Sequence, residues 1–175
     1  MNCLPHIVSV FAALMAASTA RADAATQRED QFKAAYVFNF VKFVEWPAAE
    51  TRETLTICFV GGDGVYTELA TGIADKRVGT RSLAAIQVTD TMPAPHCEAL
   101  YIEASKVASY SLPAEWAVLT ISDAADFTER GGMIGMFTEN HRLRFVINLR
   151  NAEMAGLHIS SDLLKLAAGV QRGPQ

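Results

Sequence analysis

The chain has 175 residues, of which 50% are hydrophobic, 9% aromatic and 19% charged. This apolar content excludes a disordered protein, and the length predicts a single domain. Lys and Arg number 15 against 19 Asp and Glu, which gives a net charge of −4. The chain therefore has no basic excess with which to bind a nucleic acid. Three cysteines are too few for a disulfide-rich scaffold or a four-cysteine zinc site.

The N-terminus has the pattern of an export signal. Residues 7–17 form an uncharged apolar run that is too short to span a bilayer, and Ala20-Arg21-Ala22 matches an A-x-A cleavage site. These features predict a signal peptide over 1–22 and a mature domain over 23–175; the alternative is a buried N-terminal helix. Cleavage would remove Arg21 and lower the net charge from −4 to −5. No later segment has the length of a membrane span, so we expect the mature domain to be soluble and exported.

Two cysteines, Cys58 and Cys97, follow the predicted cleavage site. An exported protein meets an oxidising compartment, where a pair of cysteines favours a disulfide. We therefore expect one Cys58–Cys97 bridge; the alternative is two free buried thiols.

The segment Gln27 to Glu45 predicts an amphipathic helix rich in aromatic residues. One face carries aromatic side chains, and valines widen it: Phe32, Tyr36, Phe40, Phe43, Val37, Val41 and Val44. Trp46-Pro47 ends the helix, because the residue before a proline leaves the helical region. Phe38 points away from this face and needs a second surface to bury it. Core packing explains most of the face, and Phe38 raises the alternative of a homodimer or partner interface.

The rest of the chain alternates short apolar runs with short helical segments. The expected strands are 55–60, 85–88, 100–102, 117–121, 133–137 and 143–149, and the expected helices are 65–74, 107–112, 122–130 and one from about 160 to 169. This alternation predicts an α/β fold with a mainly parallel sheet flanked by helices, in one domain. The last two strands lie close together along the chain, which is typical of an antiparallel pair.

No catalytic or metal-binding pattern stands out. The turn Gly61 to Gly64 follows a strand and precedes a helix, as a phosphate loop does, but Thr67 stands where the third glycine would be. A tight turn is the better interpretation. Ser160 and Ser161 lack the surroundings of a nucleophile, and the histidines lack metal-ligand spacing. We therefore expect neither an enzyme nor a bound metal or cofactor.

Three blocks of the chain together resemble the YfiR family of bacterial periplasmic proteins. They are the aromatic helix Lys33–Pro47, the strand Leu55–Gly61, and a C-terminal block that comprises Phe145–Leu149, Ala155–Ser161 and Leu163–Ala167. The resemblance covers essentially all of the mature chain. It implies an α/β sandwich, a dimer and no catalytic activity. It further implies a repressor that binds the periplasmic sensor part of an inner-membrane diguanylate cyclase, or of a sensor kinase. An outer-membrane lipoprotein would sequester this repressor.

The resemblance also assigns roles to individual residues. Cys58 and Cys97 match a family disulfide, whereas the region of a second family bridge, Thr128 to Gly135 here, has no cysteine. Small-molecule positions of the family correspond to Glu45, Trp46 and His158. Two residues that do not come from the resemblance complete the expected ligand or partner surface: Phe38 in the aromatic helix, and Asn148 at the start of the candidate surface block Asn148 to Ile159. The rival hypotheses are a periplasmic small-ligand sensor and an unrecognised hydrolase.

Overall fold

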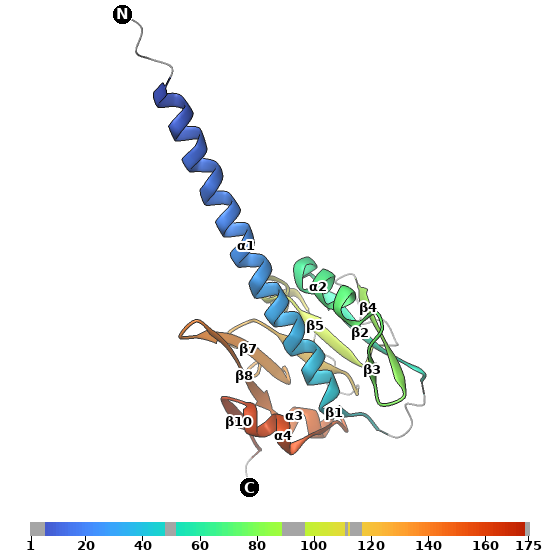
Figure 1. Cartoon of the computed structure of the whole chain (residues 1–175). Helices are drawn as coiled ribbons and strands as arrows, with labels where there is room; N and C mark the ends of the chain where they lie inside the picture. Colours follow the sequence, from blue (N-terminus) through green and yellow to red (C-terminus); the bar gives the residue numbers. More distant parts are fainter. Residues whose placement is uncertain (1–5, 48–51, 89–96, 111, 113–116, 174–175) are drawn as a thin grey trace, which may run out of the picture.

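The computed structural model describes the backbone of residues 6–47, 52–88, 97–110, 112 and 117–173, and side chains from residue 23 onward. A long helix, α1 (His6–Lys42), enters the domain at its C-terminal end, and its first half projects away from the rest of the molecule (Figure 1). The side chains of residues 23–29 are exposed along this projecting part.

The core-facing side of α1 differs from the expected one. The buried residues are Ala34, Val37, Phe40 and Val41, whereas Phe32 is 62% exposed. Two positions along a helix correspond to a rotation of about 200°, so Phe32 points away from the sheet when Ala34 faces it. The prediction that places Phe32 on the core face is therefore wrong, whereas Phe40 and the valines lie on that face as expected.

Helix α1 also ends earlier than expected, at Lys42 instead of Glu45. The next residues form β1 (Val44–Glu45), which pairs antiparallel with β9 (His158–Ile159). The Ser160 N–H donates to the Phe43 carbonyl at 2.9 Å and extends this pairing. The backbone groups that would continue the helix are thus used by a two-stranded sheet.

A sheet of eight strands among the described residues forms the centre of the domain, in the order β10-β8-β7-β6-β5-β2-β4-β3. All neighbours in it are parallel except β7–β8 and β3–β4. The strands are β2 (Thr54–Val60), β3 (Arg77–Val78), β4 (Arg81–Gln87), β5 (Ala99–Ile102), β6 (Leu119–Ser122), β7 (Ile134–Glu139), β8 (Arg142–Asn148) and β10 (Gly169–Gln171). The mainly parallel α/β prediction is confirmed.

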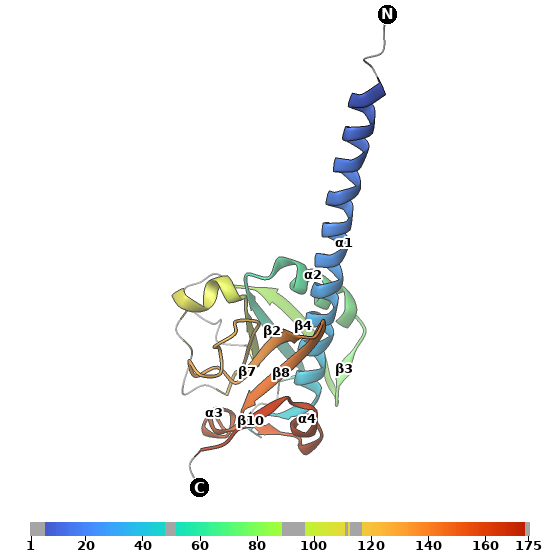
Figure 2. The ribbon, with the colours of Figure 1, turned by 90° about the vertical axis from the view of Figure 1, so that its left-hand side faces the viewer.

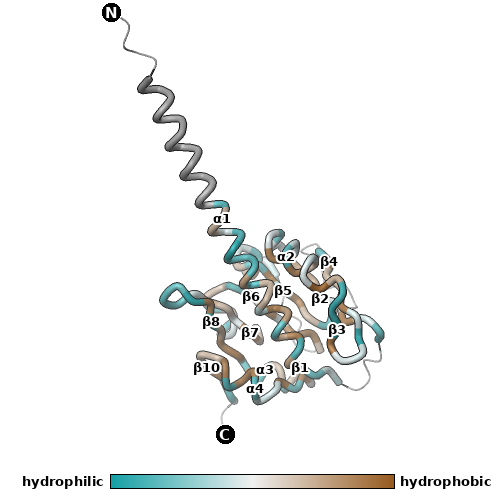
Figure 3. Tube along the Cα trace, viewed as in Figure 1, coloured by the Kyte–Doolittle hydropathy of each residue, from teal (hydrophilic) through white to brown (hydrophobic). Residues whose placement is uncertain are grey.

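Alternate residues of the central strands are buried on opposite faces of the sheet. In β2, Ile57 and Phe59 belong to the core under α1 and α2 (Asp63–Ile73), whereas Cys58 and Val60 belong to a second core. The short 3-10 helix η1 (Ala104–Ser109) contributes to the second core, and it lies across the sheet from α1 (Figure 2). The central strands β5 and β6 are consequently buried along their whole length and β2 along most of it, while hydrophilic residues collect at the tip of the β7–β8 hairpin (Figure 3).

Several short segments differ from the sequence prediction. The expected helix 122–130 is a series of turns, in which the Ser122 hydroxyl accepts from the Ala124 N–H at 3.1 Å. The C-terminal block holds two short helices, α3 (Leu149–Met154) and α4 (Ser161–Leu166), with β9 between them. The predicted antiparallel pair is present as β7 and β8. It does not form the edge of the sheet, because β10, which follows α4, pairs with the outer side of β8.

Candidate functional site

A disulfide joins Cys58, in the middle of β2, to Cys97, just before the neighbouring strand β5. The two Cα atoms are 5.7 Å apart, within the usual range for a bridge. Both cysteines are buried, at 0% and 6% exposure. The bridge closes a loop of 39 residues and stabilises the domain by roughly 4 kcal/mol on the chain-entropy model. This is the pairing expected from the sequence.

Next to the bridge lies a buried carboxylate that sequence analysis missed. Glu98 is only 2% exposed; its Oε2 accepts from the Thr56 N–H at 2.7 Å, and its Oε1 pairs with the Arg81 guanidinium. Arg52 lies 3.7 Å from the same oxygen. A buried charge needs such partners, and nothing in the local sequence around Glu98 signals that β2 and β4 will supply them.

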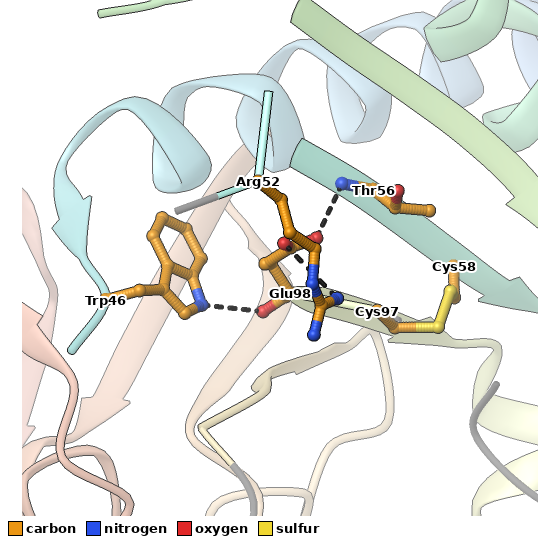
Figure 4. Close-up of a disulfide and its surroundings, with 6 residues drawn as sticks. All are labelled: Trp46, Arg52, Thr56, Cys58, Cys97 and Glu98. Atoms are coloured by element: carbon orange, nitrogen blue, oxygen red, sulfur yellow. Dashed lines mark hydrogen bonds and ion pairs between the residues drawn. A yellow bond between two sulfur atoms is a disulfide. The ribbon is translucent and has the colours of Figure 1, made fainter. Parts of the chain in front are cut away.

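The backbone of Glu98 connects this cluster to Trp46. The Trp46 indole N–H donates to the Glu98 carbonyl at 3.0 Å, and Figure 4 shows the ring lying beside the Arg52–Glu98 pair. Trp46 is half-buried and directly follows β1. The disulfide region and the end of the first helix are therefore one connected part of the structure.

Strands β1 and β9 bring three of the expected surface residues together. Glu45 and His158 are opposite each other in the antiparallel register, and both are exposed. Trp46 is the next residue along the chain. His158 lies 113 positions after Glu45 in sequence, yet the β1–β9 pairing brings the two together at the end of the domain far from the projecting part of α1 (Figure 1).

The other two expected residues lie elsewhere. Phe38 packs against the core beside α2, and the Lys76 and Lys42 ammonium groups lie 4.7 and 5.4 Å from its ring centroid. Helix α2 therefore supplies the second surface that Phe38 needs. Asn148 accepts from the Asn151 N–H and donates to the Thr128 carbonyl, both at 3.1 Å. Its amide caps α3 and ties β8 to the preceding turn.

Among the side chains that the structure describes, three large apolar ones are exposed on helices, and none of them belongs to the predicted ligand or partner surface. They are Phe32 on α1, Met154 at the end of α3 and Leu166 at the end of α4, at 62%, 69% and 67% exposure. Periodicity could have separated Phe32 from the core face. Met154 and Leu166 give no such signal, because α3 and α4 are too short for a reliable apolar stripe.

A charged cluster joins α1 to the carboxyl ends of the strands. Lys33 pairs with Asp123 at 2.7 Å and with Glu29 at 2.8 Å. Burial by itself lowers the pKa of Lys33, but the bonds to these two carboxylates outweigh burial and raise the pKa above its usual value. Burial, reinforced by Asp123, also raises the pKa of the Tyr101 phenol. Both groups therefore keep their protons at neutral pH, and the ammonium locks α1 onto the sheet.

Burial also raises the pKa of the Asp30 carboxyl. The neighbouring carboxylates Glu29, Glu68 and Asp123 raise it further, whereas the Lys33 ammonium lowers it.

Within the part of the chain that the structure describes, no group of three His, Cys, Asp or Glu side chains could hold a metal ion. Over the same residues, no helix is long and apolar enough to cross a membrane.

Taken together, the fold and the contacts define an α/β domain with one buried bridge and a small two-stranded sheet that carries polar and aromatic side chains. Residues 30–168 match the YfiR/HmsC-like family, and the chain belongs to that family. Its members are periplasmic regulators of cyclic-di-GMP signalling, and the family is regulatory rather than catalytic.

The other comparisons add little about function. The curated proteins contain no significant match to the chain. One similar solved structure is a conserved domain protein from Vibrio cholerae O1 biovar El Tor, with 11% identity and a TM-score of 0.48. The match covers 79% of this chain and 60% of that one.

Proposed function

We propose that this protein is exported, loses residues 1–22, and represses an inner-membrane signalling enzyme by binding its periplasmic sensor part. The first candidate for this enzyme is a diguanylate cyclase, whose repression lowers cyclic-di-GMP in the cell. The second candidate is a sensor kinase. The observation that carries the proposal is the family match over residues 30–168. A regulator without catalysis acts by binding one state of its partner more tightly than the other.

Two exposed apolar residues support a partner surface near the β1–β9 sheet. Met154 and Leu166 end the two short helices of the C-terminal block, and both are more than two-thirds exposed. The exposed Glu45 and His158 add polar groups at the same end of the molecule. An apolar centre with a polar rim is the usual composition of a protein–protein interface. An outer-membrane lipoprotein that sequesters the repressor would compete for this surface.

Deleting the gene in the native bacterium tests the proposal. Cyclic-di-GMP, measured by mass spectrometry, and attachment to surfaces should both rise severalfold, and the wild-type gene should reverse both. Met154→Asp and Leu166→Asp should fail to reverse them, because each places a charge in the apolar interface. Thr71→Asp, which adds the same charge at an exposed position of α2, should restore repression fully.

Immunoblots of the periplasmic fraction must show equal amounts of all variants, so that a loss of repression is not a loss of protein. Unchanged cyclic-di-GMP after deletion would contradict the proposal. The alternative, a periplasmic small-ligand sensor that uses Glu45, Trp46 and His158, would then be favoured.

A further inference from the structure

The edge strand β10 has an open side within the described part of the sheet. It pairs with β8 on one side, and among the described residues no strand pairs with the other. The Ala168 N–H donates to the Phe145 carbonyl at 2.8 Å, so the backbone groups of Ala168 point at β8. Because these groups alternate in direction along a strand, those of Gly169 and Gln171 point away from β8. Such a row of backbone donors and acceptors is a template for another extended chain.

The sequence of β10 lacks the protection that edge strands usually carry. Charged side chains and prolines block unwanted pairing at such edges, and β10 contains neither. At the opposite edge of the sheet, β3 carries Arg77, whose guanidinium bonds back to the turn that follows it. Gly169 presents no side chain, and the Gln171 amide donates to the Thr128 hydroxyl at 3.2 Å. The open edge of β10 is therefore accessible, and its end is held in position.

An apolar side chain and two basic side chains border this edge. Leu166, at the end of α4, is 67% exposed and lies three residues before Gly169. Arg172 follows β10 directly and is exposed, and the exposed Arg150 of α3 lies against Gly173. Neither guanidinium has a carboxylate partner within the described part of the chain. The chain has a net charge of −4, yet it places two positive charges at this edge.

These charges favour one kind of extended chain over another. A second copy of this protein would bring the same edge, and its residues 163–173 contain Lys165 and Arg172 but no Asp or Glu. It would therefore offer no carboxylate to the two guanidinium groups. An extended segment of another protein with carboxylates beside its strand residues satisfies them, and complementary charge also speeds the encounter. In such strand addition, main-chain hydrogen bonds give affinity and alternate side chains give specificity.

We infer that β10 binds an extended acidic segment in the periplasmic part of the repressed enzyme, and that this segment joins the sheet as a further strand. Its backbone pairs with Gly169 and Gln171, an apolar side chain covers Leu166, and its carboxylates pair with Arg150 and Arg172. This mode of binding rests on the proposed function, to which it adds the contact and the chemistry of the bound segment.

A matched pair of substitutions at Gly169 tests the strand addition. Gly169→Pro removes the outward N–H and spares the bonds between β10 and β8, because proline is tolerated on edge strands where the N–H faces solvent. Gly169→Ala keeps the N–H, and its Cβ would lie 3.5 Å from the nearest atom of Val146, an ordinary contact. In the deletion strain, Gly169→Ala should restore low cyclic-di-GMP. Gly169→Pro should fail to do so at an equal periplasmic amount.

The purified domain measures the same contact directly. The probe is the purified periplasmic part of the membrane enzyme whose own deletion cancels the rise in cyclic-di-GMP. In isothermal titration, Gly169→Pro should weaken binding at least tenfold, and so should the double variant Arg150→Glu with Arg172→Glu. Arg142→Glu, at an exposed position of the β7–β8 hairpin, should leave the affinity unaltered. The melting temperature verifies that each variant is folded.

Amide hydrogen exchange of the wild-type domain, followed by NMR, separates strand addition from other contacts. The Gly169 and Gln171 amides should exchange at least tenfold more slowly when the probe is bound, whereas the Val170 amide, which faces β8, is protected already.

The outcomes separate the mode of binding from the proposed function. Unchanged cyclic-di-GMP after deletion contradicts both. If deletion raises cyclic-di-GMP but Gly169→Pro represses like the wild type, or if the bound probe leaves the Gly169 and Gln171 amides unprotected, strand addition alone is contradicted. A dimer that Gly169→Pro converts to a monomer in light scattering would make a second copy the occupant, and would also overturn the assignment.

Discussion

Glu98 connects more parts of this structure than any residue singled out from the sequence. Its carboxylate bonds to β2 through Thr56 and to β4 through Arg81, and its carbonyl accepts from Trp46 at the end of the first helix. It is also adjacent to the disulfide. These contacts therefore fix the position of Trp46 relative to the disulfide. They depend on the Glu98 carboxylate, whose charge finds its hydrogen-bond partners only in the folded chain.

We predict that Glu98→Gln lowers the free energy of unfolding by about 2–3 kcal/mol. The amide can still accept from Thr56, but it removes the charge that Arg81 faces in a region largely closed to water. The control is Glu139→Gln, which breaks an ion pair whose side chains are about half exposed and should cost less than about 1 kcal/mol. Urea denaturation of both variants with the bridge intact measures the difference. Equal costs would mean that the Glu98–Arg81 pair is not effectively buried.

Such a residue shows why part of the site could not be predicted. Continuous apolar runs identify the strands around Cys58 and Leu100, because nearly every position there is buried on one face of the sheet or the other. It cannot identify Glu98, since the partners that make its burial tolerable come from strands remote in sequence. The disulfide was predictable for a different reason: only two cysteines follow the predicted cleavage site.

At the scale of elements, length decided which predictions succeeded. The long strands β2 and β8 and the helix α2 carry enough residues for a period to be visible. Strands β1, β3, β9 and β10 have two or three residues each, so only the tertiary pairing defines them. Tertiary pairing also explains the early end of α1. The helical pattern of the sequence continues through Val44 and Glu45, but these two residues pair with β9 instead.

Helix α1 also changes the basis for expecting a dimer. Phe38 finds its second surface within the monomer, against α2, whereas Phe32 is 62% exposed on the other side of the helix. We propose that the protein dimerises through α1 and that a partner copy covers Phe32. An exposed aromatic ring of this kind is typical of the centre of an interface.

We predict that Phe32→Asp weakens the dimer by at least tenfold, because an unpaired carboxylate would be buried between the two copies. The fold should be unaffected, since Phe32 contributes little to the core of the monomer. Light scattering across micromolar concentrations measures the change, with Ser105→Asp on the exposed side of η1 as the control. A wild-type protein that is monomeric at these concentrations, or a dimer that persists in Phe32→Asp, would contradict this assignment.

At the scale of the whole molecule, stability depends on the compartment that the chain reaches. Among the side chains of α1 that the structure describes, residues 23–29 are exposed and Ala34 is the first that is buried. The Cys58–Cys97 bridge holds the domain below this helix together, and such a bridge forms only where thiols are oxidised.

The final prediction links export to stability. Expressed in a Gram-negative bacterium, the full chain should be released by osmotic shock with a mass that begins at Asp23, and maleimide should label neither Cys58 nor Cys97. A version that starts at Asp23 without the leader should stay in the cytoplasm with both thiols free after denaturation. Its free energy of unfolding should be lower by about 2–5 kcal/mol, the usual cost of losing a native bridge. Oxidation of that purified version in vitro should restore the difference, because the two chains are otherwise identical. A cytoplasmic full chain that retains residues 1–22, or equal stability of the reduced and oxidised forms, would contradict this account.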